Sequence, residues 1–211
     1  MAKQKRSQEV IQKVVDAVCE ALLQMDESLI RIPEICDQTG VNYGSVYHHF
    51  GSRDGVIDEA YAQLYVGLVE TDVTFINDLV ARNDSFDDFV QGCRQLIEVT
   101  SNSSDRRTVR SIRIRILAAS QTRPELFMKI ASIQTHRTTE IEKSIIAAQK
   151  KGFIRSEVSA HEVSVAIQTL LIGRTLDDTS LAPVSDEQWA KMTERFLFSY
   201  LSDTPKPRVK K

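Results

Sequence analysis

The placement of glycine and proline constrains the fold of this chain more than any other feature. The 211 residues include 8 glycines and 5 prolines, which cluster at breaks between segments whose apolar residues have helical spacing. Strand-like alternation is almost absent. The exception is SIRIRIL at 111–117, and helical stretches flank it. The sequence therefore predicts an all-α protein.

The predicted helices are separated by polar or proline-containing breaks and begin at recognisable capping residues. Asn42 and Ser52 are expected N-caps, and Ser185 with Gln188 has the spacing of a capping box. The expected helices span about 7–25, 31–39, 43–50, 52–80, 86–101, 105–121, 124–151, 159–178 and 185–202.

This order of helices divides naturally into a small unit and a larger one. We expect a three-helix domain at 1–51, a helical bundle at 52–203 and a basic disordered tail at 204–211. A basic arm of Lys3, Lys5 and Arg6 precedes the first domain. The net charge of -2 does not itself suggest a nucleic-acid binder, but such an arm beside a DNA-reading motif could reach phosphates.

The helices at 31–39 and 43–50 are joined by the short turn from Thr39 to Asn42, which is the spacing of a helix-turn-helix. Gly40 stands where the turn needs a left-handed residue, and Val41 is expected to fill the crease between the helices. The small core beneath would comprise Ile35, Val46 and Phe50.

The outward face of the second of these helices carries polar and aromatic residues. Tyr and His can donate hydrogen bonds to phosphates, glycine permits a close backbone approach, and polar residues near the helix N-terminus can meet base edges. The DNA-facing residues predicted on this face are Asn42, Tyr43, Gly44, Ser45, Tyr47 and His48.

The segment IPEICDQTGVNYGSVYHHFGSRDGVIDEAY resembles the DNA-binding segment of the TetR (tetracycline-repressor-like) family of bacterial transcriptional regulators. The resemblance covers about 30 residues. The positions that match the family pattern are Ile35, Gly40, Val41, Gly44, Ser45, Val46, Tyr47, His49, Phe50, Ser52, Arg53 and Asp54.

This resemblance implies a homodimer, a double-stranded DNA operator and an all-helical C-terminal domain that binds a small-molecule effector. The sequence departs from the family pattern at Asn42, where Ser is usual, at Tyr43, where Lys is common, and at Gly51. The motif has therefore lost positive charge. Arg31 and Arg53 are also predicted to contact DNA.

The adjacent residues His48 and His49 do not predict a metal site. Neighbouring side chains on a helix point about 100° apart, so the pair cannot chelate one ion from its own helix. We expect His48 to face phosphate and His49 to pack inward. No nucleophile elbow, phosphate loop or dinucleotide fingerprint is present, so we predict neither an enzyme nor a cofactor.

The three cysteines, Cys19, Cys36 and Cys93, lie far apart and form no C-x-x-C pair, which favours free thiols in a reducing compartment. No apolar run has the length of a membrane helix, and no signal peptide follows the basic N-terminus. We expect a cytoplasmic protein with no membrane partner, located at the nucleoid when bound to DNA.

Two arginines fall on apolar helix faces in the larger unit. Arg113 shares a face with Ile112 and Ile116, and Arg137 lies within the Ile stripe of 124–151. A salt bridge to a neighbouring helix is the favoured explanation, and a pocket for an anionic effector is the alternative. The residues that could line such a pocket are Gln95, Arg113, His136, Arg137 and Thr169.

The last two helices carry more apolar residues than one face requires, which suggests a dimer interface. The residues predicted there are Val163, Ala166, Ile167, Leu170, Gly173, Trp189, Met192 and Phe196.

Together these features predict a ligand-responsive, homodimeric repressor that releases a palindromic operator. The alternatives are a TetR-type activator, a ligand-binding or protein-interaction module with weak or no DNA binding, and a small helical enzyme.

Overall fold

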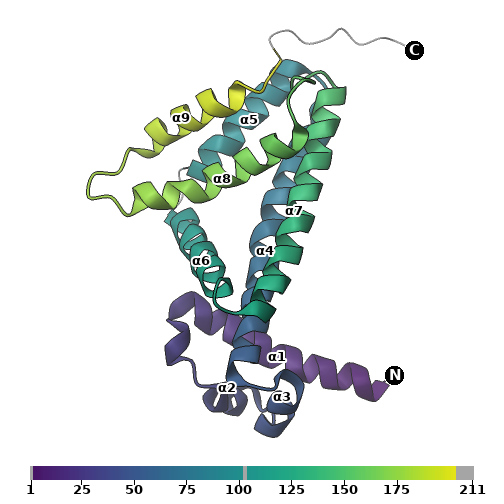
Figure 1. Ribbon diagram of the computed structural model, residues 1–211, viewed down its shortest axis with the longest axis vertical. Helices are drawn as coiled ribbons and strands as arrows, with labels where there is room; N and C mark the ends of the chain where they lie inside the picture. The colour runs from purple at the N-terminus through teal and green to yellow at the C-terminus, as the bar shows by residue number, and fades with distance from the viewer. Residues whose placement is uncertain (1, 102–103, 203–211) are drawn as a thin grey trace. The chain divides into compact units, whose positions relative to one another are not determined.

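The computed structural model describes residues 2–101 and 104–202 of the chain, and helices joined by turns and loops make up that part (Figure 1). The described residues contain no strand, only an isolated bridge between Ile154 and Leu201. The all-α prediction is confirmed, and SIRIRIL lies inside a helix. The elements are α1 (Ala2–Gln24), the 3₁₀ turn η1 (Glu27–Leu29), α2 (Ile32–Thr39), α3 (Tyr43–Phe50), α4 (Arg53–Arg82), α5 (Phe86–Ser101), α6 (Ser104–Ser120), α7 (Pro124–Lys150), α8 (Ala160–Asp178) and α9 (Asp186–Phe198).

Two helix ends differ from the sequence prediction by more than two residues. The first helix already begins at Ala2, because the lysines, glutamine and arginine before residue 7 are good helix formers. The last helix ends at Phe198 instead of 202, because its continuation pairs with another segment: Arg155 N–H donates to the Tyr200 carbonyl and Ser202 N–H donates to that of Phe153. The predicted tail at 204–211 lies outside the described residues.

The chain forms two compact units, and α4, α6 and α7 contribute residues to both. The first unit extends to Gly67 and includes Ile116–Ala131; the second contains Leu68–Arg115 and the chain from Ser132 onward. This packing boundary falls within α4. The functional division expected at residues 51 and 52 therefore remains a proposal.

In the first unit, α1, α2 and α3 enclose a small core with the start of α4. The side chains of Val14, Val18 and Leu22 are spaced three to four residues apart on α1 and are fully buried. Arg123 bridges η1 and α4 by donating hydrogen bonds to Glu27 and, at 2.9 Å, to Asp58. Burial raises the pKa of Asp58, although the hydrogen bond from Arg123 lowers it.

The second unit packs α5, α8 and α9 with the later turns of α4 and α7, and α5 lies against α9 (Figure 1). Its core is apolar and draws on four helices and the loop after α7. The buried side chains of this core are Ile76, Val80, Phe89, Ile141, Ile145, Ala148, Phe153, Ile154 and Val163.

Candidate functional site

The turn between α2 and α3 has the geometry that its sequence predicts. Gly40 caps α2 in the left-handed conformation, with φ of 68°, where a Cβ atom is unfavourable. Val41 is buried between the two helices, and Ile35 and Val46 are buried beneath them. The Asn42 side chain accepts a hydrogen bond from Ser45 N–H at 3.2 Å and so caps α3.

This packing leaves the outward face of α3 open. Asn42, Tyr43, Gly44, Ser45 and His48 are exposed, and Tyr47 is half-buried. The face therefore presents hydroxyl, imidazole and amide groups, and the helix from Tyr43 to Phe50 carries no lysine or arginine. A rigid helix with this mixture of donors and acceptors can meet both phosphates and base edges.

Tyr43 and Tyr47 act as one element of this face, because they lie one helical turn apart. Their ring centroids are 4.3 Å apart and the rings are tilted by 36°. The hydrogen bond with Tyr47 raises the pKa of Tyr43, so its hydroxyl remains protonated and able to donate.

The two arginines predicted to contact DNA are in different environments. Arg31 is exposed just before α2, and its side chain makes no capping hydrogen bond. Arg53, at the start of α4, is held within the first unit: its guanidinium donates to the Glu27 and Ile30 carbonyls and pairs with Asp54 at 3.0 Å. A DNA contact by Arg53 would have to replace some of these bonds.

His48 and His49 differ in their surroundings, but one expectation was wrong: His49 is exposed instead of packed inward. The inward positions of α3 are Val46 and Phe50, four residues apart, and His49 is rotated about 100° from Phe50 around the helix axis. The His49 ring instead meets the edge of Phe50, with centroids 4.6 Å apart. Within the part of the chain that the structure describes, no three His, Cys, Asp or Glu side chains gather as metal ligands.

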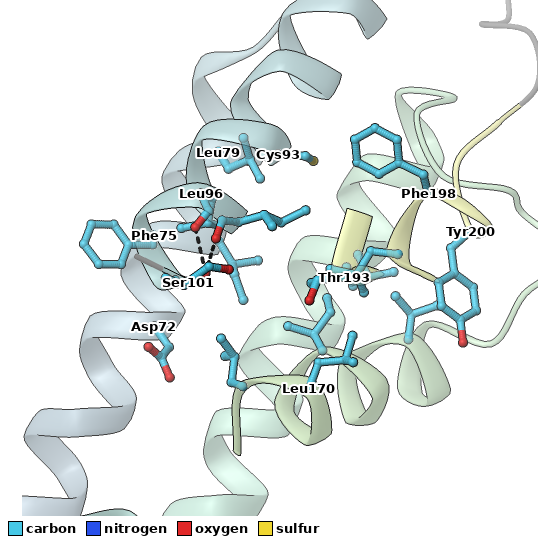
Figure 2. Close-up of a pocket in the computed structure, with 18 of the residues that line it drawn as sticks. Asp72, Phe75, Leu79, Cys93, Leu96, Ser101, Leu170, Thr193, Phe198 and Tyr200 are labelled. Atoms are coloured by element: carbon cyan, nitrogen blue, oxygen red, sulfur yellow. Dashed lines mark hydrogen bonds between the residues drawn. The ribbon is translucent and has the colours of Figure 1, made fainter. Parts of the chain in front are cut away.

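The second unit contains a partly open cavity of about 130 Å³ lined by α4, α5, α8 and α9, with single contributions from α6 and α7 (Figure 2). Most of its wall is apolar, and Figure 2 shows side chains from several helices pointing into it. The apolar wall includes Phe75, Ile76, Leu79, Phe89, Leu96, Ile97, Ile167, Leu170, Trp189, Leu197, Phe198 and Tyr200; its polar members are Asp72, Thr100, Ser101, Arg110, Arg174 and Thr193.

Of the five residues predicted for a ligand pocket, none lines this cavity. Gln95, His136 and Thr169 are exposed on their helices. Arg113 and Arg137 are buried, and each pairs with Asp72 of α4, at 2.7 and 2.8 Å. Both arginines therefore form salt bridges to a neighbouring helix, which is the explanation that the sequence favoured.

Asp72 is the centre of a buried ion cluster that joins three helices. Besides Arg113 of α6 and Arg137 of α7, it lies 3.7 Å from Arg106, one turn before Arg110 on α6. Arg113 also donates to the Leu68 carbonyl. One carboxylate thus faces three guanidinium groups, in a place where unpaired charge is costly.

Sequence reasoning missed Arg110, Arg174 and Thr193 of the cavity wall. Arg174, like Arg113, is a charged residue on an apolar helix face, because it follows Leu170 and Leu171 at helical spacing on α8. Thr193 lies between Trp189 and Leu197 on α9, one turn from each, on a face that is otherwise apolar. In both helices, a polar side chain within an apolar stripe was the sequence pattern that could have identified these residues.

The residues predicted for a dimer interface divide between two faces of α8 and α9. Val163, Ile167, Leu170 and Trp189 line the cavity, so they have contacts inside the unit. Ala166 and Gly173 are half-buried, whereas Met192 and Phe196 are exposed. Sequence reasoning missed two exposed neighbours on α8, Val165 and Leu176.

The three thiols are unreactive in their surroundings. Burial raises the pKa of Cys19 and of Cys93 to about 12, and it also raises that of Cys36. Each thiol is therefore protonated at neutral pH and is a poor nucleophile. Cys93 serves as an apolar part of the cavity wall.

Comparison with known proteins agrees with this architecture. Residues 30–60 match the sequence model of the family described as "Bacterial regulatory proteins, tetR family", a stretch that runs from the residue before Arg31 through the start of α4. The resemblance drawn from the sequence is confirmed. No curated protein sequence matches the chain.

Solved structures match the fold along nearly the whole chain. A Mesorhizobium loti protein assigned to the TetR family is 14% identical, with a TM-score of 0.69 over 92% of this chain and 96% of its own. A TetR-family regulator from Cytophaga hutchinsonii, also 14% identical, gives 0.67 over 98% of both chains. A Saccharomonospora viridis protein in complex with choline is 16% identical and gives 0.63 over 93% of this chain and 100% of its own.

The fold is thus that of the TetR-family transcriptional regulators, with an N-terminal helix-turn-helix and a helical C-terminal part. No helix among the described residues has the length and apolar character needed to span a membrane.

Proposed function

We propose that the chain is a ligand-responsive transcriptional regulator: a homodimeric repressor that releases a near-palindromic DNA operator when a small molecule binds the cavity of its second unit. The observation that carries the proposal is α3, a capped helix with a buried inner side and an open, polar outer face. Two copies of α3 would enter successive major grooves, about 34–36 Å apart.

Operator binding is tested by combining Tyr47→Phe with His48→Ala. We expect affinity for the operator to fall by at least about thirtyfold, because each protomer loses two phosphate hydrogen bonds worth about 0.5–1.5 kcal/mol each, which makes four in the dimer. The operator is first selected from randomised DNA and from the region upstream of the chain's own gene, and affinity is then measured by fluorescence anisotropy.

The matched control makes the same two chemical changes in the second unit, at Tyr200 and at His161, which is exposed. It should bind the operator like the unaltered protein. Unchanged operator affinity in the α3 variant would instead favour the alternative function, a ligand-binding or protein-interaction module that does not bind DNA. The absence of lysine and arginine from α3 is the observation that keeps this alternative open.

The proposed dimer interface lies on the outer faces of α8 and α9. Leu176 is 82% exposed and Val165 44%, and on α9 Met192 and Phe196 are 45% and 46% exposed. Gly173 has no neighbour within 4 Å of an added Cβ, so a second helix can approach closely there. An isologous contact would bury these side chains against their symmetry mates.

This interface is tested by the double change Met192→Asp with Phe196→Asp. We expect a monomer in sedimentation velocity, because four carboxylates would be buried in each symmetric contact. The control is Phe127→Asp with Met128→Asp, a pair on α7 that is at least as exposed, which should leave the dimer intact. A dimer that survives the α9 change would place the contact elsewhere.

The ligand signal is proposed to travel along α4. This helix supplies Asp72, Phe75 and Leu79 to the cavity wall, and its first turn, with Arg53, follows α3 directly. A ligand that binds one position of α4 better than another shifts the population of dimers whose α3 helices match the operator spacing. Activation in place of repression would use the same parts, and transcription assays distinguish the two.

A further inference from the structure

The cavity is polar at one end and apolar at the other. On α4, Asp72 precedes Leu79 by seven residues, which is about 10 Å along the helix axis. On α5, Phe89 lies near the first turn and Ser101 at the last residue. Figure 2 shows the same separation along α4, with Leu79 near the top of the view beside Cys93 and Asp72 lower down.

The other two long walls have the same polarity. On α8, Val163 lies in the apolar core and Arg174 lies eleven residues later, donating from Nη1 to the Ser101 carbonyl at 2.9 Å. On α9, Trp189 packs against the Arg174 guanidinium, which is 5.3 Å from its ring centroid, and Leu197 follows two turns later. A ligand that fills the cavity therefore meets charged groups at one end only.

Two polar atoms of the cavity wall are buried and have no hydrogen-bond partner: Arg174 Nε at this end, and Thr193 Oγ1, one turn beyond Trp189 on α9. Arg174 is 5% exposed and Thr193 is 8% exposed. The carboxylate oxygen of Asp178 nearest to Arg174 Nε is 3.6 Å away, beyond hydrogen-bonding distance. An unpaired buried donor costs about 1–3 kcal/mol, so a native structure that keeps two of them in a cavity wall calls for an acceptor to meet them.

The charge around this end is positive. Arg110 and Arg174, both buried, share the buried carboxylate of Asp178, with Arg110 Nη2 at 2.6 Å. The third partner, Asp186, is mostly exposed and so screened by water. Arg113 and Arg137 are likewise buried, and among the described residues both pair with the carboxylate of Asp72. Buried guanidinium groups that outnumber buried carboxylates favour an anion.

From these observations we propose that the cavity binds a small amphiphilic carboxylate, with its head group at Arg174 and Thr193 and its apolar body between Phe89 and Leu79. The proposal rests on the proposed ligand response and gives the effector its chemical class. A dry cavity of about 150 Å³ holds one benzene molecule, so 130 Å³ suits about six carbons of an apolar body, and a slightly longer chain extends through the open side of the cavity. A compact cation such as choline would meet Arg110 and Arg174 at this end, and the Asp72 carboxylate there already pairs with Arg113 and Arg137.

The test uses octanoate as the probe and 1-octanol and choline as comparisons, with calorimetry on the full chain. We expect octanoate to bind at least tenfold more tightly than 1-octanol, and choline not to bind. Thr193→Val keeps the shape and removes the hydroxyl, so it should weaken octanoate binding about threefold to tenfold while leaving 1-octanol unchanged. Thr139→Val, an exposed position on α7 with its own backbone hydrogen bond, is the matched control and should alter neither.

Thr193→Val is expected to fold at least as stably as the unaltered protein, because it removes an unpaired buried hydroxyl. Leu96→Trp, which fills the cavity, should abolish octanoate binding and so locate the site. Absence of octanoate binding, equal binding of octanoate and 1-octanol, or tighter binding of choline would each overturn the proposal.

The calorimetric readout separates this inference from the function on which it rests. If octanoate binds as expected but operator DNA is not released, the ligand class stands and the regulatory proposal fails. If operator DNA is released by another compound while octanoate does not bind, regulation stands and the carboxylate proposal fails.

Discussion

Replacing Asp72 with asparagine is expected to lower the free energy of unfolding by about 3–5 kcal/mol. The change keeps the size of the side chain and removes its charge, which leaves Arg113 and Arg137 buried without their carboxylate. Arg137 is 0% exposed, so water cannot replace the lost partner. Urea unfolding followed by the fluorescence of Trp189, the chain's one tryptophan, measures the effect in the same unit.

Asp78→Asn is the matched control, since it makes the same change on the same helix. Asp78 pairs with Arg82 at 2.5 Å, one turn along α4, but its side chain is 45% exposed. Its removal should cost about 0.5 kcal/mol or less. If the Asp72 variant were no less stable than the Asp78 variant, the buried cluster would contribute nothing to stability.

Gly55→Ala should destabilise the first unit by about 2–3 kcal/mol through overpacking. A Cβ at residue 55 would lie 2.2 Å from the Phe50 carbonyl oxygen. Because that oxygen belongs to the backbone, no change of side-chain conformation can relieve the clash. Thermal unfolding followed by circular dichroism measures the loss. Because Phe50 ends α3, the variant should also bind the proposed operator less tightly.

Gly67→Ala provides the comparison within α4. Nothing lies within 4 Å of a Cβ at residue 67, so the change should stabilise the helix by about 0.5–1 kcal/mol. If Gly55→Ala and Gly67→Ala raised the free energy of unfolding by similar amounts, the backbone between α3 and α4 would be able to adjust freely. That result would contradict the close contact between residue 55 and the Phe50 carbonyl oxygen.

Local signals in the sequence were enough to predict the helices. Asn42 and Ser185 mark helix starts through their own side-chain hydrogen bonds, and Gly40 marks an end through its conformation, so each acts within a few residues. The end of α9 was predicted less well. Its limit is set by pairing with the segment around Phe153, more than 40 residues away in sequence.

The cavity could not be predicted in the same way. Arg113 and Arg137 were marked as charges on apolar faces, but Asp72, their partner, lies at least 41 residues from either and has no local pattern of its own. The helices α8 and α9 are apolar on more than one side, so sequence alone could not separate the residues that line the cavity, such as Leu170, from those that remain exposed, such as Phe196.

The composition of α3 determines how the affinity for an operator should depend on ionic strength. DNA binding through lysine and arginine releases condensed counterions, and affinity then falls steeply as salt rises. The outer face of α3 instead offers the hydroxyls of Tyr43 and Tyr47 and the imidazole of His48. An operator complex made through this face would release few counterions, and its strength would depend on the fit of hydrogen bonds more than on the salt content of the cell.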